Sequence, residues 1–196
     1  MKMKNIFEKG DFSGYQIDSL NEAVGTIKTS YYTFAEKKTT IFISHKHDDL
    51  EELKGIIGFL EKKYKVKVYI DSQDLSMPKT TSGETARRIK ERIKTCEKFI
   101  LLATDGAIES KWCNWELGFG DAQKYDSMSI ALFPFKDKGT YDSSYKGNEY
   151  MEIYPHIVYR GGNDKYSSGE KIQEGYYVRY KEEGKYYLTP LEKWLT

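Results

Sequence analysis

Residues 40–135 alternate between short apolar runs and longer segments whose apolar residues recur at helical spacing. The apolar runs are "TIFIS" (40–44), "VKVYI" (66–70), "KFILLA" (98–103) and "SIALFPF" (129–135). Runs of this kind are typical of strands covered on both faces, and helical connections between strands favour parallel pairing. The alternation therefore predicts an α/β fold in which a doubly wound parallel sheet carries helices on both faces.

Residues that prefer helix N-termini stand before three of the helical segments. Asp48 with Glu51, and Thr81 with Glu84, have the spacing of a capping box. Ser110 stands before the third segment. These residues predict where the three helices begin.

The two ends of the chain differ from its centre. Residues 18–37 have apolar residues at helical spacing and predict one amphipathic helix. Of the 17 tyrosines, 11 fall between Tyr141 and Tyr187, which indicates a more β-like C-terminal part. There "YYVRY" and "KYYL" surround "KEEG" and predict a β-hairpin. Thr189 and Pro190 then predict the N-cap and first residue of a short terminal helix.

These patterns divide the chain into three parts. We expect an N-terminal helical extension (1–39) and a central α/β domain (40–160), which ends with a fifth strand, "HIVYR" (156–160). A C-terminal extension (161–196) follows, made of the hairpin and the short helix.

Charge and cysteine content exclude several classes of protein. Lys and Arg number 31 and Asp and Glu number 30, so the net charge of +1 provides no large field to hold nucleic acid or an anionic membrane. The two cysteines have no CxxC spacing, which fits a reducing compartment. The apolar runs are too short to span a bilayer, and the N-terminus lacks the apolar stretch of a secretory signal. We therefore expect a cytoplasmic protein without a nucleic-acid or membrane partner.

Open parallel sheets bind ligands beyond the carboxyl ends of their strands. One helix that begins near this edge carries Trp112 and Glu116, four residues apart and therefore on one face. The loops that should form the edge are residues 44–47, 71–74, 104–106 and 134–136.

Glu116 is a lone carboxylate in an aromatic stretch, "ESKWCNWELGFG" (109–120). Cleavage of an N-glycosidic bond builds positive charge on the sugar carbon, and a carboxylate in a partly apolar pocket stabilises that charge. The ring of Trp112 can stack on a flat heterocycle. We expect Cys113 and Leu117 to face the core, and Trp115 to be a packing residue.

Other interpretations of the same residues stay open at this point. Glu116 also fits a surface acid between packed tryptophans. The run "HKHDD" (45–49) suggests metal ligands, but side chains two apart at a helix start diverge, so we expect no metal. "GFGDAQ" (118–123) lacks a preceding strand and a third glycine, so it is not a dinucleotide fingerprint. Its two glycines are expected to allow close helix packing.

Three segments resemble motifs of the TIR (Toll/interleukin-1 receptor) domain, of the type found in Thoeris-like bacterial antiphage defence. "IFISHKHDD" resembles the first box, a strand that ends in Ser-His. "KVYIDSQDLSMPKTTSGETARRI" resembles the second strand with its long loop, and "SKWCNWELG" resembles the helix with the catalytic glutamate. The resemblance covers about half of the chain.

This resemblance implies a flavodoxin-like fold with strand order 2-1-3-4-5. It implies that NAD⁺ is a substrate, cleaved to nicotinamide and ADP-ribose or a cyclic ADP-ribose, with no further cofactor. By motif match, Glu116 takes the catalytic place and Trp112 the aromatic place before it. Ser44 and His45 line the substrate pocket, and Asp71 begins a loop that often takes part in self-assembly.

The sequence therefore favours two functions. The first is a TIR NAD⁺ glycohydrolase or cyclase in bacterial immunity, active as a homo-oligomer, whose nucleotide product activates a downstream effector. The second is a TIR interaction module without catalysis. A flavodoxin-like nucleoside transferase with a glutamate nucleophile is a third possibility, since it shares the sugar chemistry.

Overall fold

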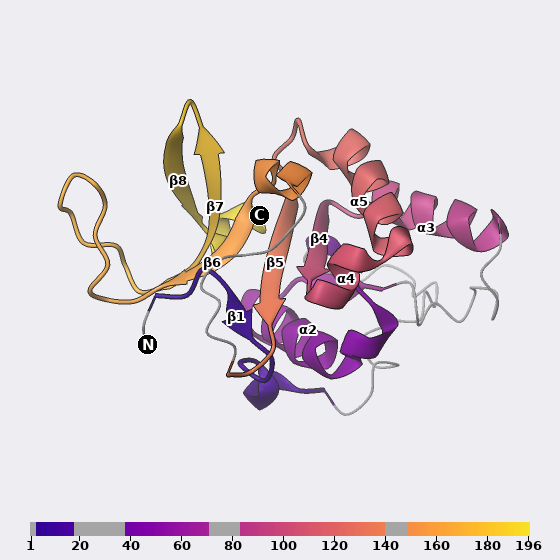
Figure 1. The fold of residues 1–196 in the computed structure, drawn as a ribbon, viewed down its shortest axis with the longest axis horizontal. Coiled ribbons are helices and arrows are strands. Elements are labelled where there is room, and N and C mark those ends of the chain that lie inside the picture. Colours follow the sequence, from indigo (N-terminus) through magenta and orange to yellow (C-terminus); the bar gives the residue numbers. More distant parts are fainter. Residues whose placement is uncertain (1–2, 18–37, 71–82, 140–148) are drawn as a thin grey trace.

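The computed structural model describes residues 3–17, 38–70, 83–139 and 149–196. One mixed sheet forms the centre, with helix α2 on one face and helices α3, α4 and α5 on the other (Figure 1). Each face buries its own apolar cluster against its helices. The helices are α2 (Leu50–Tyr64), α3 (Gly83–Thr95), α4 (Asp105–Glu109) and α5 (Lys111–Lys124).

The strand order is β3-β2-β4-β5-β6-β7-β8, with β1 paired beside β5. Strands β2 to β6 are parallel and, numbered from β2, follow the order 2-1-3-4-5, which confirms the predicted fold class. The strands are β1 (Phe7–Glu8), β2 (Thr40–Ser44), β3 (Lys67–Tyr69), β4 (Lys98–Ala103), β5 (Ile130–Lys136), β6 (His156–Arg160), β7 (Gly175–Glu182) and β8 (Lys185–Pro190).

Of the three predicted helix starts, one agrees with the structure, one differs, and one lies outside the described residues. Ser110 caps α5, as predicted, because its side chain accepts a hydrogen bond from the backbone N of Cys113. Asp48 does not cap α2, since the turn His47–Asp49 moves the N-cap to Asp49. Thr81 and the helix predicted at 18–37 lie outside the described residues.

The C-terminal strands extend the sheet beyond β6. Strands β7 and β8 form an antiparallel hairpin, and β7 also pairs antiparallel with β6. The short helix α6 (Leu191–Trp194) follows, with Pro190 as its N-cap, so the prediction that Thr189 is the N-cap was wrong. Pro190 is still paired with Tyr177 as the last residue of β8, which delays the helix. No helix among the described residues is long and apolar enough to cross a membrane.

The N-terminal segment is part of the core. Strand β1 pairs with the end of β5 through Phe7 and Phe135, and Lys4 forms a bridge to Tyr159 on β6. Phe7 is fully buried and Phe12 nearly so, and their rings lie 5.4 Å apart. The segment therefore closes a gap between β5 and β6 that short β5–β6 pairing leaves open.

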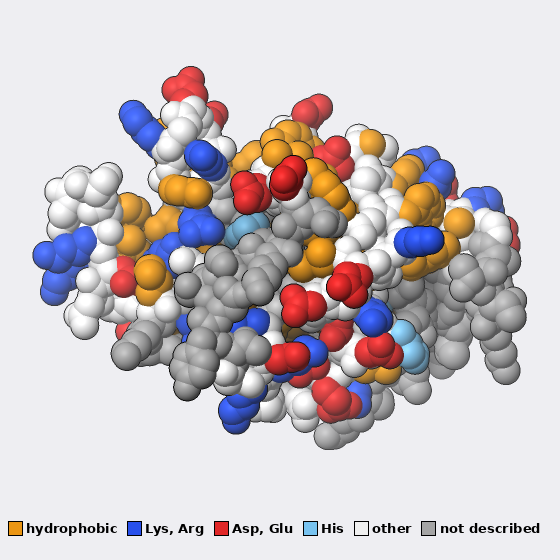
Figure 2. Space-filling view, viewed as in Figure 1, with side chains coloured by type: hydrophobic (Ala, Val, Ile, Leu, Met, Phe, Trp, Pro, Cys, Tyr) orange, Lys and Arg blue, Asp and Glu red, His pale blue; other side chains and the backbone are white. Residues whose placement is uncertain are grey.

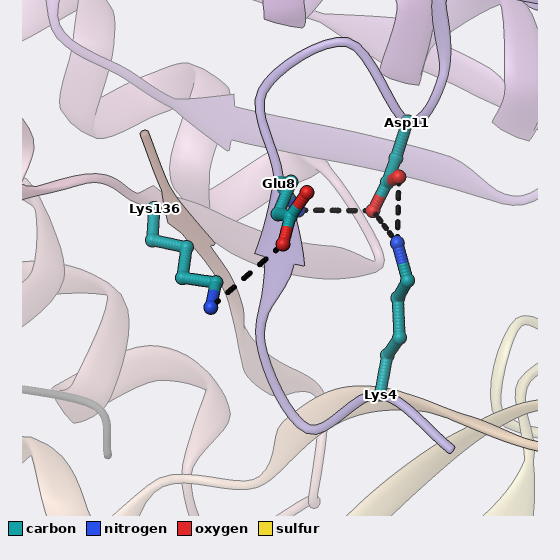
Figure 3. Close-up of polar contacts among 4 residues, drawn as sticks. All are labelled: Lys4, Glu8, Asp11 and Lys136. Carbon is teal, nitrogen blue, oxygen red and sulfur yellow. Dashed lines mark hydrogen bonds and ion pairs between the residues drawn. The ribbon is translucent and has the colours of Figure 1, made fainter. Parts of the chain in front are cut away.

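Charged side chains close the loop around β1 (Figure 3). Lys4 Nζ donates to both Asp11 carboxylate oxygens at 2.6 Å, and Asp11 accepts the backbone N–H of Glu8 at 2.9 Å. Lys136 lies 3.8 Å from the Glu8 carboxylate. These contacts fix the turn that leads from β1 into the short helix η1 (Ser13–Tyr15).

Two glycines of α2 allow the N-terminal segment to lie directly on that helix. A Cβ at Gly55 would stand 2.7 Å from the carbonyl oxygen of Phe12. A Cβ at Gly58 would stand 1.9 Å from the carbonyl oxygen of Tyr15. Because both neighbours are backbone atoms, the segment has to move away if either glycine gains a side chain.

We predict that Gly58→Ala lowers the free energy of unfolding by at least about 2 kcal/mol, because the added methyl overlaps backbone. Gly118→Ala is the matched control in α5, where nothing lies within 4 Å of the new Cβ. This control should gain roughly 0.5–1 kcal/mol from helix propensity. Chemical denaturation of both variants checks the contrast, and a similar effect of the two substitutions contradicts it.

Candidate functional site

Ser44 and Glu116 meet in the interior of the protein. Ser44 is the last residue of β2 and points to the same sheet face as Phe42, which is the face covered by α5. Its hydroxyl donates a hydrogen bond to Glu116 Oε2. Glu116 is only 1% exposed and Ser44 is fully buried. Burying a carboxylate is costly unless it is hydrogen-bonded, so this contact helps to hold the acid where it lies.

Close packing of α5 on the sheet brings Glu116 to the end of β2. Cys113 and Leu117 are each 1% exposed and belong to the cluster beneath α5, which confirms that they face the core. A Cβ at Gly120 would lie 2.9 Å from the ring of Phe99, so this glycine permits the close approach. The sequence analysis predicted close helix packing at both Gly118 and Gly120. This prediction was wrong for Gly118, which is exposed with open space around it.

Trp112 lies one turn before Glu116, as the spacing requires. Its ring is half-buried and stands 5.0 Å from the ring of Trp115, which continues to Phe119. Lys90 of α3 lies over the rings of Trp115 and Phe119. Trp115 is thus a packing residue between α5 and α3, as predicted. For Trp112 the structure shows the contact with Trp115, and its role against a substrate stays a prediction.

The other expected pocket residues follow the ends of β2 and β3. His45 directly follows Ser44 and is 5% exposed, so it lies at the predicted edge but inside the protein. Asp71 lies outside the described residues. The structure therefore brings Ser44 and Glu116 into contact, and the placing of His45 in the same pocket stays a prediction.

Three residues that were not among the predicted site residues form a second polar contact at this edge. Asp49 is 4% exposed and accepts a hydrogen bond of 2.5 Å from the Thr104 hydroxyl. Lys9 lies 3.6 Å from the other Asp49 oxygen and 2.9 Å from Asp137. The hydrogen bond to Asp137 raises the pKa of Lys9, burial opposes this, and Asp49 adds to the rise. The N-terminal segment thus supplies a cation to the carboxyl ends of β2, β4 and β5.

The loop that carries His45 is anchored on both sides. Ser44 binds Glu116 before it, and Asp49 binds Thr104 and Lys9 after it. Among the described residues no three His, Cys, Asp or Glu side chains gather as a possible metal site. Asp49 accepts a hydrogen bond from the Thr104 hydroxyl and lies close to the Lys9 ammonium group.

We predict that Lys9→Met lowers the free energy of unfolding by about 1–2 kcal/mol, because the buried Asp49 carboxylate loses its cation. The loss stays below that of a fully buried pair because the Lys9 side chain is 34% exposed. Lys138→Met removes an exposed lysine nearby and should leave stability unchanged. Equal unfolding midpoints for Lys9→Met and the unaltered protein contradict the role of Lys9.

A surface hollow lies elsewhere on the protein. It is formed between the N-terminal segment, α2 and the end of β5, on the sheet face opposite α5. None of the predicted site residues lines it; the lining residues are Gly10, Phe12, Ser13, Gln16, Glu51, Glu52, Gly55 and Phe135. Glu116, which is only 1% exposed, is closed to solvent in this structure.

The parallel sheet, its strand order and the buried acid on α5 define a flavodoxin-like protein with its candidate site at the carboxyl edge of the sheet. A family model for the TIR domain matches residues 41–154, and the chain belongs to the TIR domain family. It is similar to a protein of Bacillus cereus (strain MSX-D12) named probable 3′ cyclic ADP-D-ribose synthase ThsB′. The two are 30% identical over 147 residues, which are 74% of each chain.

Proposed function

We propose that this protein is an NAD⁺-cleaving enzyme of bacterial antiphage defence, which breaks the bond between nicotinamide and ribose. The observation that carries the proposal is the buried Glu116 carboxylate, held by Ser44 at the carboxyl end of β2. The similarity to a probable cyclic ADP-ribose synthase supports the same chemistry.

The reaction begins with cleavage of the glycosidic bond. The bonding electron pair moves to the nicotinamide nitrogen, which neutralises the pyridinium, and positive charge develops on the ribose C1. Glu116 stabilises this charge, and the low dielectric of its surroundings strengthens the interaction. Because the leaving group departs as a neutral molecule, the step needs no general acid and no further cofactor.

The second step decides the product. When water attacks C1 and loses a proton, the product is ADP-ribose. When a hydroxyl of the same molecule attacks and loses its proton, a ring closes and the product is a cyclic ADP-ribose. The name of the similar Bacillus cereus protein favours cyclisation.

Residues around Glu116 have positioning roles in this proposal. Ser44 orients the carboxylate through its hydroxyl, and His45 borders the ribose at the end of β2. Trp112 stacks on the nicotinamide ring from one turn before Glu116. Asp71 begins the loop over the site and takes part in assembly.

The buried state of Glu116 also bears on activation. A carboxylate that is 1% exposed is not ready to meet a substrate. We therefore expect the free chain to turn over slowly, and assembly into a homo-oligomer to open the site. The product then acts as a signal for a downstream effector.

We predict that Glu116→Gln lowers nicotinamide release by at least about 10²-fold, because the charge that stabilises C1 is lost. Ser44→Ala should lower it about tenfold, since the carboxylate loses one hydrogen bond. Glu109→Gln, which removes an exposed acid near the start of α5, should be as active as the unaltered protein. NAD⁺ consumption at high protein concentration, with products resolved by mass, measures all three.

The same assay separates the alternatives. Turnover that survives in Glu116→Gln rejects the catalytic assignment. Self-association without loss of NAD⁺ favours the interaction module, and cleavage of nucleosides in place of NAD⁺ favours the transferase.

A further inference from the structure

Two arginines meet on one neutral oxygen at the base of the hairpin. Arg160 Nη1 donates to Asn5 Oδ1 at 3.0 Å, and Arg179 Nη1 donates to the same oxygen at 3.2 Å. Arg160 ends β6, Arg179 lies on β7, and Asn5 precedes β1. Three separate segments of the chain therefore bring two positive groups together.

Among the described residues, the only carboxylate whose charge acts on Arg160 is that of Asp164, and it forms no ion pair with the guanidinium. Arg160 is 7% exposed, and its remaining acceptor is the carbonyl oxygen of Tyr159. Among the described residues no carboxylate forms an ion pair with Arg160 or Arg179. The nearby Asp164 carboxylate accepts the backbone N–H of Gly161.

The local electrostatics agree with an excess of positive charge. Burial lowers the pKa of Arg160, the positive charge of Arg179 lowers it further, and the negative charge of Asp164 opposes both effects. His156 is paired opposite Arg179, and burial together with that arginine lowers the pKa of His156 to about 4. His156 is therefore neutral near pH 7 and adds no positive charge. Figure 2 shows basic side chains beside a histidine at the base of the hairpin.

Arg179 is half-buried, so part of its guanidinium is accessible to a ligand from solvent. Its guanidinium lies 5.0 Å from the ring of Tyr186, a side chain that is 65% exposed. Stacking of this kind orients the planar group and leaves its N–H donors in one plane. An oxyanion can then bridge the two arginines with paired hydrogen bonds.

We propose that Arg160 and Arg179 form a binding site for a phosphate group, with a diphosphate as the ligand class that matches two positive charges. A carboxylate offers only one negative charge to the two guanidinium groups. His156 is level with Ser44 and three strands away, and Arg160 follows it by four residues, so the Arg160 Cα lies roughly 20 Å from that of Ser44. In NAD⁺ the diphosphate is only a few bonds from the reacting C1, so this site serves a second phosphorylated ligand.

Thermal unfolding with sodium pyrophosphate tests the proposal, with sodium acetate at equal ionic strength as the comparison. The unaltered protein should gain roughly 5 °C in Tm at saturating pyrophosphate and nothing in acetate. No gain in pyrophosphate, or an equal gain in acetate, overturns the proposal.

Two substitutions assign the effect to the arginines. Arg179→Met should abolish the gain without lowering Tm in the absence of the anion, because it removes a repulsive charge. Lys181→Met, on the same strand, removes an exposed lysine that also lies near Tyr186 and should keep the gain. A lowered Tm in Arg179→Met without the anion, or a loss of the gain in both variants, contradicts the site.

Asn5→Asp provides an internal anion at the shared oxygen. We expect this variant to have a higher Tm than the unaltered protein and to gain nothing further from pyrophosphate. An unchanged Tm shows that the arginines are already compensated and overturns the proposal. Glu116→Gln should keep the full pyrophosphate gain, so this test does not depend on the proposed enzyme activity.

Discussion

The hydrogen bond from Ser44 to Glu116 joins the end of β2 to the middle of α5. It places a carboxylate inside the protein, where an ionised group is stable only with polar partners. The packing of α5 on the sheet sets the position of this carboxylate. Cys113 and Leu117 fill the space beneath the helix, and Gly120 lets the helix approach Phe99. The candidate site is therefore a product of how this helix lies on the sheet.

The N-terminal segment connects the regions that we assign to function. Phe7 and Phe12 anchor it in the cluster on the α2 face. From that position it contributes Lys9 to the buried Asp49 and Asn5 to the two arginines. A substitution in this segment can therefore alter the contacts at the carboxyl edge of the sheet and at the base of the hairpin, while the TIR motifs stay the same.

Much of the fold could be predicted because its signals are local. The strands at 40–44, 98–103 and 156–160 have the predicted bounds, since each contains a run of at least three apolar residues next to polar or charged ones. Strand β1 could not be found this way, because two residues carry no periodicity and their pairing with β5 is distant in sequence.

The candidate site shows the same division. Ser44 and Glu116 were predicted from motifs, and the structure brings these two into contact. The contact between Thr104 and Asp49 joins residues 55 positions apart, so the local sequence around either residue could not predict it. Lys9 was not predicted as a site residue, because it lies beside Asp49 and Asp137 only when strand β1 forms. The sequence analysis did not predict this strand.

A crystal structure of the Glu116→Gln variant with NAD⁺ tests the central claim most directly. We expect the nicotinamide ribose to lie with its C1 against the side chain at position 116, and Ser44 and His45 to border the ribose. NAD⁺ bound only in the hollow between the N-terminal segment and α2, away from position 116, would contradict it.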